Sequence, residues 1–271
     1  MTTYAPLIEP SDFAPLLDND DLLIVQVTSP ETYQKIHLPN AVLVTPSQLM
    51  SGNAPARGSV PSTDRLNELM QSIGLTADKH MVVYDDEGGG WAGRMIWTLD
   101  YIGHTKWSYL NGGLHAWYGE QLTLSSDTTA VTPSDYTITA LNEDVRATSG
   151  FIIDHLGKPN FAVWDARSLA EHTGEQVLAQ QGGHIPGASH LEWTDLMDPN
   201  KQLRLRPFDV IQARLDSLDL SGDKTVVTHC QSHHRSGLTY LVGRLLGYHD
   251  IRGYDGSWSE WGNDLSLPTE S

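Results

Sequence analysis

Cysteine is almost absent from this chain, since Cys230 is the single one among 271 residues. One thiol cannot form an intramolecular disulfide, which excludes the class of small secreted domains held together by such bonds. Basic residues are also scarce, with 17 Lys and Arg against 34 Asp and Glu and a formal net charge of -17. That charge repels nucleic acid and anionic membrane surfaces, so we expect neither as a partner.

Long apolar segments are missing as well. No run of apolar residues approaches the length of a membrane span. Residues 1–17 contain no Lys or Arg and hold Pro6, Pro10 and Pro15, a composition unlike that of a signal or transit peptide. We therefore expect a cytoplasmic protein, and a monomer. Hydrophobic residues make up 39% of the chain, which indicates a globular protein of one large domain or two ordinary ones.

An internal repeat divides the chain in two. Residues 82–118 align without a gap to residues 226–262, and identical glycine and tryptophan residues recur in the same order. The matched pairs are Gly93 with Gly237, Gly103 with Gly247, Gly112 with Gly256 and Trp117 with Trp261. The period is too long for a solenoid. We therefore predict two homologous domains, residues 1–119 and 134–271, joined by a Ser- and Thr-rich linker at 120–133.

Each half alternates short apolar strands with amphipathic helices. In the second half we expect strands at 161–165, 224–228 and 250–253 and helices at 207–218 and 236–247. The first half repeats this pattern at 22–27, 63–73, 81–84, 93–103 and 107–110. The alternation predicts the α/β class, with a parallel sheet covered by helices on both faces in each domain. Ligands of such sheets bind beyond the carboxyl ends of the strands.

Cys230 lies at such a strand end, and its surroundings favour a reactive thiol. A loop from Gln231 to His234 joins the strand to a helix that begins near Arg235. Backbone N–H groups of such a loop, the helix dipole and the Arg235 charge favour a thiolate over a thiol. The polar neighbours argue against an inert buried cysteine. His233 and His234 are either solvated or tune the charge of the loop, and as adjacent residues they fit a metal site poorly.

Three stretches, in order, resemble the rhodanese family. Residues 163–167 with 183–188 resemble its opening motif, residues 229–236 its active loop and residues 254–261 its C-terminal signature. The likeness spans nearly the whole chain as a tandem pair of rhodanese-like domains, and the His-His-Arg version of the loop looks like that of two-domain bacterial rhodaneses.

This resemblance implies a thiosulfate sulfurtransferase without a cofactor or a metal. The Cys230 thiolate would take the outer sulfur of thiosulfate as a persulfide and pass it to cyanide or a thiol. Arg235 would hold the anion, and Gln231, Ser232, His233 and His234 would line the substrate site. Because the chain has no second cysteine, the acceptor comes from outside, for example a thioredoxin or glutathione thiol.

Three features of the sequence qualify the resemblance. Asp86 stands in the first half where Cys230 stands in the second, so we expect the first half to be inactive in sulfur transfer. Asp165 and Arg167 either form an ion pair that braces the loop or touch substrate. Some animal thiosulfate enzymes carry one basic residue a few positions beyond the opening motif and another inside the loop. Glu171 and Ser232 stand near these positions here, so those substrate contacts do not transfer to this chain.

Other functions stay open. Only four residues separate Cys230 from Arg235, fewer than in the tyrosine-phosphatase signature, so the loop is narrow for a phosphoryl group. A 3-mercaptopyruvate sulfurtransferase usually carries a smaller, uncharged loop. A persulfide carrier for protein thiols would have the same cysteine, and a binding module would leave Cys230 unreactive.

Overall fold

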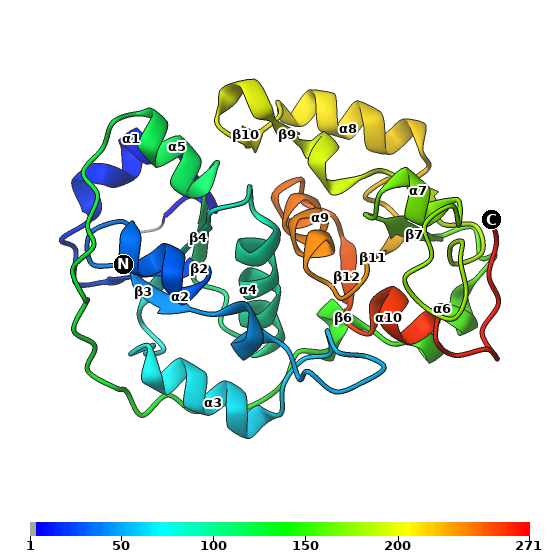
Figure 1. The fold of residues 1–271 in the computed structure, drawn as a ribbon, viewed down its shortest axis with the longest axis horizontal. Helices are drawn as coiled ribbons and strands as arrows, with labels where there is room; N and C mark the ends of the chain where they lie inside the picture. Colours follow the sequence, from blue (N-terminus) through cyan, green and yellow to red (C-terminus); the bar gives the residue numbers. More distant parts are fainter. Residues whose placement is uncertain (1–3) are drawn as a thin grey trace. The chain divides into compact units, whose positions relative to one another are not determined.

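The computed structural model describes residues 4–271, which fold into two compact units (Figure 1). The first unit consists of residues 4–49, 61–141 and 197–205. The second unit consists of residues 50–60, 142–196 and 206–271. Each unit therefore includes one short segment from the other half of the chain. The domain limits expected at residues 119 and 134 stay a prediction.

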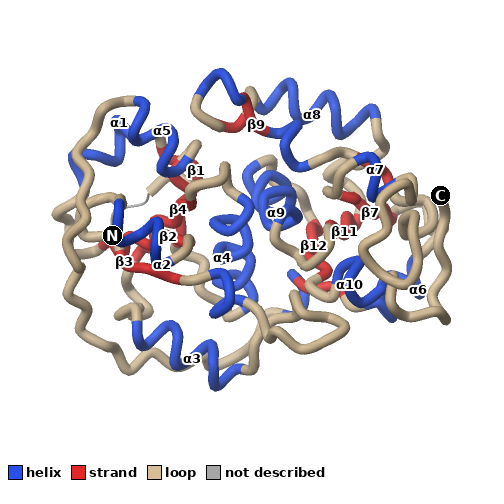
Figure 2. The backbone as a smooth tube through the Cα atoms, viewed as in Figure 1, coloured by secondary structure: helices blue, strands red, loops and turns tan. Residues whose placement is uncertain are grey.

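The sheet of the first unit has five parallel strands in the order β1-β5-β4-β2-β3. They are β1 (Leu7–Ile8), β2 (Leu22–Val27), β3 (Val42–Val44), β4 (His80–Asp85) and β5 (Trp107–Leu110). Figure 2 draws strands in red and labels β1, β4, β2 and β3 of this sheet. Branched apolar residues dominate β2, residues 81–84 of β4 are a run of Met, Val, Val and Tyr, and both strands are buried almost throughout. Near-continuous apolar strands are typical of a parallel sheet with both faces covered.

Helices pack on both faces of this sheet. The α-helices are α1 (Pro10–Phe13), α2 (Pro30–Lys35), α3 (Thr63–Ser72), α4 (Gly90–Tyr101) and α5 (Gly113–Gly119), with 3-10 turns η1 (Ala14–Leu16) and η2 (Pro46–Leu49). Ile24 and Val82 share one core with Phe13 of α1 and Trp117 of α5. Side chains alternate between the two faces along a strand. The buried residues next to Ile24 and Val82 in β2 and β4 therefore face the opposite side of the sheet, where α4 contacts β2, β4 and β5.

A hairpin from the second half of the chain belongs to the first unit. Strands β9 (Met197–Asp198) and β10 (Arg204–Leu205) pair antiparallel around the 3-10 turn η5 (Pro199–Lys201). The Leu205 N–H donates to Asn111 Oδ1 at 2.9 Å. Arg204 also forms ion pairs with Glu9 and Glu120. These contacts attach the hairpin to the first unit.

The second unit repeats the topology of the first. Its strands are β6 (Arg146–Ala147), β7 (Phe161–Asp165), β8 (Ser189–His190), β11 (Thr225–His229) and β12 (Asp250–Tyr254), all parallel, in the order β6-β12-β11-β7-β8. In both sheets, the first strand along the chain is at one edge, followed by the fifth, fourth, second and third. This identity of strand order confirms the predicted pair of homologous α/β domains.

Helices again cover both faces. They are α6 (Ser149–His155), α7 (Leu169–His172), α8 (Phe208–Ser217), α9 (Arg235–Leu245) and α10 (Ser257–Trp261), with 3-10 turns η3 (Glu143–Val145) and η4 (Trp193–Leu196). One core joins Val163 and Val227 of the sheet to Ile152 of α6 and to Trp258 and Trp261 of α10. The buried side of α9 contacts β11 and β12.

Within residues 4–271, none of the helices combines the length and the apolar character that crossing a membrane would need.

Candidate active site

The loop of residues 230–234, which carries Cys230, starts where the central strand of the second unit ends. Strand β11 lies between β12 and β7 and ends at His229, and helix α9 begins at Arg235. Asp165, the last residue of β7, is the register partner of His229. Cys230 therefore lies at the carboxyl edge of the sheet, where parallel α/β sheets bind ligands.

The start of α10 holds the loop from one side. Trp258 N–H donates to the Cys230 carbonyl at 2.9 Å, and Ser259 N–H donates to the Gln231 carbonyl at 3.0 Å. The Cys230 N–H reaches Ser257 Oγ at 3.4 Å. These hydrogen bonds satisfy the N–H and carbonyl of Cys230 and the carbonyl of Gln231, so they fix the backbone of the loop at Cys230.

His233 gives the loop its tight curvature. Its φ is +57°, a left-handed conformation that is uncommon outside glycine. Its side chain is fully buried, with Nδ1 2.7 Å from Ser236 Oγ. His233 therefore packs beneath the loop, which is a different place from the solvated one considered from sequence. Its neighbour His234 lies half-buried, with its ring 5.5 Å from that of Trp193.

The thiol of Cys230 is nearly enclosed, with 1% of the residue exposed. Burial by itself would raise its pKa, but the Arg235 charge, the hydroxyl and N–H of Ser236 and the nearby His234 outweigh it, so the pKa is lowered. The surroundings of Cys230 therefore favour the thiolate form of its side chain more than burial alone would.

Arg235 forms a two-pronged ion pair with Glu171. Its Nη1 lies 2.6 Å from Glu171 Oε2 and its Nη2 lies 2.8 Å from Oε1. Glu171 is also the third residue of α7, where it forms a capping box with Ser168. The pattern Ser-x-x-Glu is visible in the sequence and predicts a helix start, but it does not reveal a partner 64 residues away.

Asp165 and Arg167 form a buried ion pair under the loop. Arg167 Nη2 lies 2.6 Å from Asp165 Oδ2, and the side chains are 1% and 0% exposed. His172 Nδ1 contacts the same carboxylate at 2.9 Å. The guanidinium of Arg167 lies 4.3 Å from the ring centre of Trp258. Of the two roles considered from sequence, bracing is the one that this geometry supports.

The remaining loop residues lie at its rim. Gln231 Nε2 donates to the Leu178 carbonyl at 3.3 Å. Ser232 packs against Gly58, a contact that no sequence motif predicts. A Cβ added to Gly58 would lie 2.2 Å from the Ser232 carbonyl oxygen, so only glycine permits this approach.

The corresponding loop of the first unit is filled by a side chain of its own. The Asp85 carboxylate accepts hydrogen bonds from the N–H groups of Glu87, Gly88, Gly89 and Ala92 at 2.8 to 3.2 Å. Gly88 and Gly89 have φ of 94° and 106°, which turns these N–H groups inward. An anion cradle therefore exists in this unit, but a neighbouring carboxylate occupies it.

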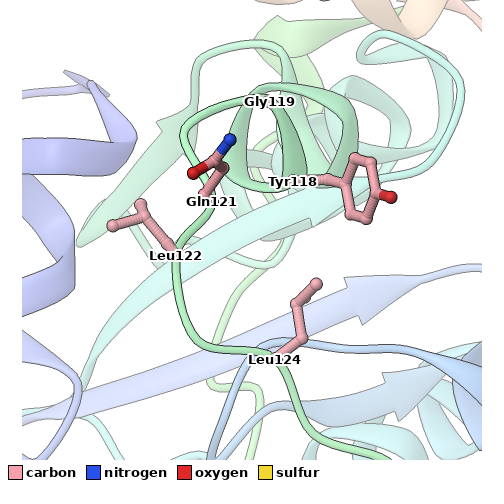
Figure 3. Close-up of a pocket in the computed structure, with 5 residues that line it drawn as sticks. All are labelled: Tyr118, Gly119, Gln121, Leu122 and Leu124. Carbon is pink, nitrogen blue, oxygen red and sulfur yellow. The ribbon is translucent and has the colours of Figure 1, made fainter.

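A surface hollow of about 350 Å³ also lies in the first unit (Figure 3). It is lined by Tyr118, Gly119, Gln121, Leu122 and Leu124. None of these side chains is a nucleophile of the strength of a thiolate or a charged group. The hollow therefore offers no alternative to the Cys230 loop as a catalytic site.

Comparison with known proteins decides the family. The model of the rhodanese-like domain matches residues 9–120 and again residues 151–264. The chain belongs to the rhodanese family. A thiosulfate sulfurtransferase of Azotobacter vinelandii is 46% identical over 264 residues, which cover 97% of this chain and 96% of that protein. This confirms the tandem rhodanese suggested by the sequence motifs.

Two further matches have lower sequence identity. The 3-mercaptopyruvate sulfurtransferase of Escherichia coli is 29% identical over 245 residues, covering 89% of this chain and 85% of that one. The crystal structure of YnjE matches with a TM-score of 0.89 at 19% identity, covering 98% of this chain and 68% of that chain. The latter likeness concerns the fold alone.

Proposed function

We propose that the protein moves the outer sulfur of thiosulfate to cyanide or to a thiol through a persulfide on Cys230. One observation carries this proposal: the single thiol of the chain has a lowered pKa at the base of a loop between a strand end and a helix start. A thiolate is the form that attacks sulfur. The 46% identity to a thiosulfate sulfurtransferase over nearly the whole chain supports the choice of donor.

The reaction balances in two steps. The Cys230 thiolate forms a bond to the outer sulfur of thiosulfate, the S–S bond of thiosulfate breaks, and sulfite leaves with the bonding electron pair. The persulfide sulfur is then attacked by cyanide, which releases thiocyanate and returns the thiolate. A thiol acceptor, including a thioredoxin or glutathione thiol, would instead take the sulfur as its own persulfide. Ping-pong kinetics follow from this order.

Charge and backbone dipoles would assist both steps. The N–H groups of Gln231, Ser232, His233 and His234 precede the start of α9, so they are suited to stabilise anionic sulfur. Among the charges that act on the Cys230 thiol, that of Arg235 favours the thiolate most. Asp165 and Arg167 would act beneath the loop by keeping it in place.

We assign catalysis to the second half, residues 134–271, and a non-catalytic role to the first, residues 1–119, with 120–133 as their link. The Asp85 carboxylate in the anion cradle of the first unit supports this division, as does Asp86 at the cysteine position. We further propose a reducing compartment such as the cytoplasm, because one unpaired thiol must stay free to carry sulfur.

Steady-state kinetics test the proposal. Thiocyanate formation from thiosulfate and cyanide should give parallel lines in double-reciprocal plots, and Cys230→Ser should abolish it. Intersecting lines would contradict a persulfide intermediate. Turnover with 3-mercaptopyruvate but not with thiosulfate would keep the nucleophile and replace the donor.

A further inference from the structure

Glu171 is an unexpected neighbour for a site that receives anions. Its carboxylate accepts two hydrogen bonds from Arg235 at 2.6 and 2.8 Å and two from the hydroxyl and N–H of Ser168 at 2.9 and 3.2 Å. The side chain is 5% exposed, and that of Arg235 is 19% exposed. These four hydrogen bonds and the burial of the side chain hold the carboxylate in one position, since a planar guanidinium fork and a carboxylate match in geometry.

The pairing changes what Arg235 can offer to a substrate. Both Nη atoms point to Glu171, so the end-on face of the guanidinium, which would grip an oxyanion with two parallel bonds, is occupied. The charge of Arg235 is also balanced by a carboxylate at contact distance. A donor anion therefore meets a nearly neutral pair in place of a free cation.

Neither Arg167 nor His229 makes up for the neutralised charge of Arg235. Arg167 is balanced by Asp165 in the same way. Burial lowers the pKa of His229 to about 4, despite the favourable charge of Asp165, so His229 is neutral at pH 7. Among the charges that act on the Cys230 thiol, that of Arg235 has the largest effect, and Glu171 holds it.

We propose that Glu171 is the specificity-determining residue of this site. By holding and neutralising Arg235, Glu171 weakens the preference of the site for sulfur donors that carry two negative charges. This inference rests on the proposed sulfur transfer from thiosulfate. Thiosulfate carries two negative charges, whereas the carboxylate of 3-mercaptopyruvate carries one. A change of one charge at the site therefore acts about twice as strongly on thiosulfate, by Coulomb's law.

The same carboxylate acts on the nucleophile. A fixed negative charge behind Arg235 opposes the stabilisation that Arg235 gives to the thiolate. Removing the charge while keeping the shape of the side chain should therefore make the thiolate more stable. If Glu171 served in helix capping alone, its substitution would leave both the pKa of the Cys230 thiol and the choice of donor unchanged.

The test compares Glu171→Gln with the wild type and with Glu175→Gln. Glu175 is exposed and lies in the same segment, so its variant removes an equal charge without touching Arg235. We expect Glu171→Gln to lower the KM for thiosulfate and to raise the ratio of kcat/KM for thiosulfate over 3-mercaptopyruvate at least about fivefold. Glu175→Gln should change this ratio less than about twofold, because exposed charges are screened.

A second readout does not depend on either donor. The rate of alkylation of the single thiol by iodoacetamide, followed against pH, reports the pKa of Cys230. We expect the midpoint to move to lower pH in Glu171→Gln and to stay in Glu175→Gln. The groups that bear on this thiol are Arg235, His234 and Ser236, and all three are unchanged in these variants.

The outcomes separate the inference from the proposed function. An unchanged donor ratio together with an unchanged alkylation midpoint in a folded Glu171→Gln protein overturns the role of Glu171. If wild type takes no sulfur from thiosulfate, the proposed function fails, while the alkylation midpoint still decides whether Glu171 governs the thiol. If Glu171→Gln does not fold, Glu171→Asp replaces it: its side chain is one methylene shorter, which draws the carboxylate back from Arg235, and the same shifts are expected at smaller size.

Discussion

The buried pair beneath the loop offers a quantitative test of how the second unit is held together. Asp165 Oδ1 and Oδ2 accept bonds from Arg167 Nε and Nη2 at 2.9 and 2.6 Å, and the Arg167 N–H adds a third at 3.0 Å. Asp165→Asn removes the negative charge but nearly keeps the volume. It leaves the positive charge of the Arg167 guanidinium, whose side chain is 1% exposed, without a negative charge to balance it.

Removal of one partner of a buried ion pair costs about 3 to 5 kcal/mol of unfolding free energy, because the other charge stays buried. We expect a loss of that size for Asp165→Asn in urea denaturation at pH 7. Asp154→Asn is the matched control, since Asp154 is an exposed residue of α6, and it should change the unfolding free energy by less than about 0.5 kcal/mol.

The assay must report on the second unit, because a chain of two units need not unfold in one step. Hydrogen exchange of peptides covering β7 and β11 at increasing urea assigns the transition to this sheet. A loss below about 1 kcal/mol for Asp165→Asn, with native exchange in α9, would refute the reasoning, because it would mean that Arg167 is stable without its partner.

Two further predictions concern acid and the approach of Gly58. Because the folded pKa of His229 is about 4, the unfolded chain binds a proton below pH 6.5 that the folded chain excludes, so unfolding free energy should fall by about 3 kcal/mol from pH 6.5 to 4. His229→Gln should flatten this fall in urea titrations, and an equal slope in both proteins would contradict it. Gly58→Ala, whose Cβ would lie 2.2 Å from the Ser232 carbonyl oxygen, should reduce kcat/KM for thiosulfate about tenfold through displacement of the loop. Gly150→Ala, with 3.9 Å to its nearest neighbour, should leave it unchanged; equal activities would show that the loop adapts.

Much of this architecture could be predicted from local sequence pattern. The strand at 161–165 was expected at the bounds that the structure has, and the helix expected at 236–247 begins at Arg235 and ends at Leu245. These elements carry strong apolar periodicity or runs bounded by glycine, and the repeat supplied the same information twice. Helix ends differ by a residue or two because capping depends on local backbone geometry.

The contacts that shape the active site could not be predicted in this way. Glu171 and Arg235 are 64 residues apart, and nothing in either local pattern identifies the other as its partner. Gly58 reaches Ser232 from the other half of the chain. The bonds of Asp85 to its own loop depend on positive φ at Gly88 and Gly89. Such features follow from tertiary packing, which periodicity does not encode.

The central claim is that Cys230 carries sulfane sulfur, and intact-mass measurement tests it most directly. Wild-type protein incubated with thiosulfate should gain the mass of one sulfur atom and lose it on addition of cyanide. Cys230→Ala, which leaves the chain without any thiol, should show no gain under the same conditions. A gain of sulfur by Cys230→Ala, or none by wild type with either thiosulfate or 3-mercaptopyruvate, would contradict the account.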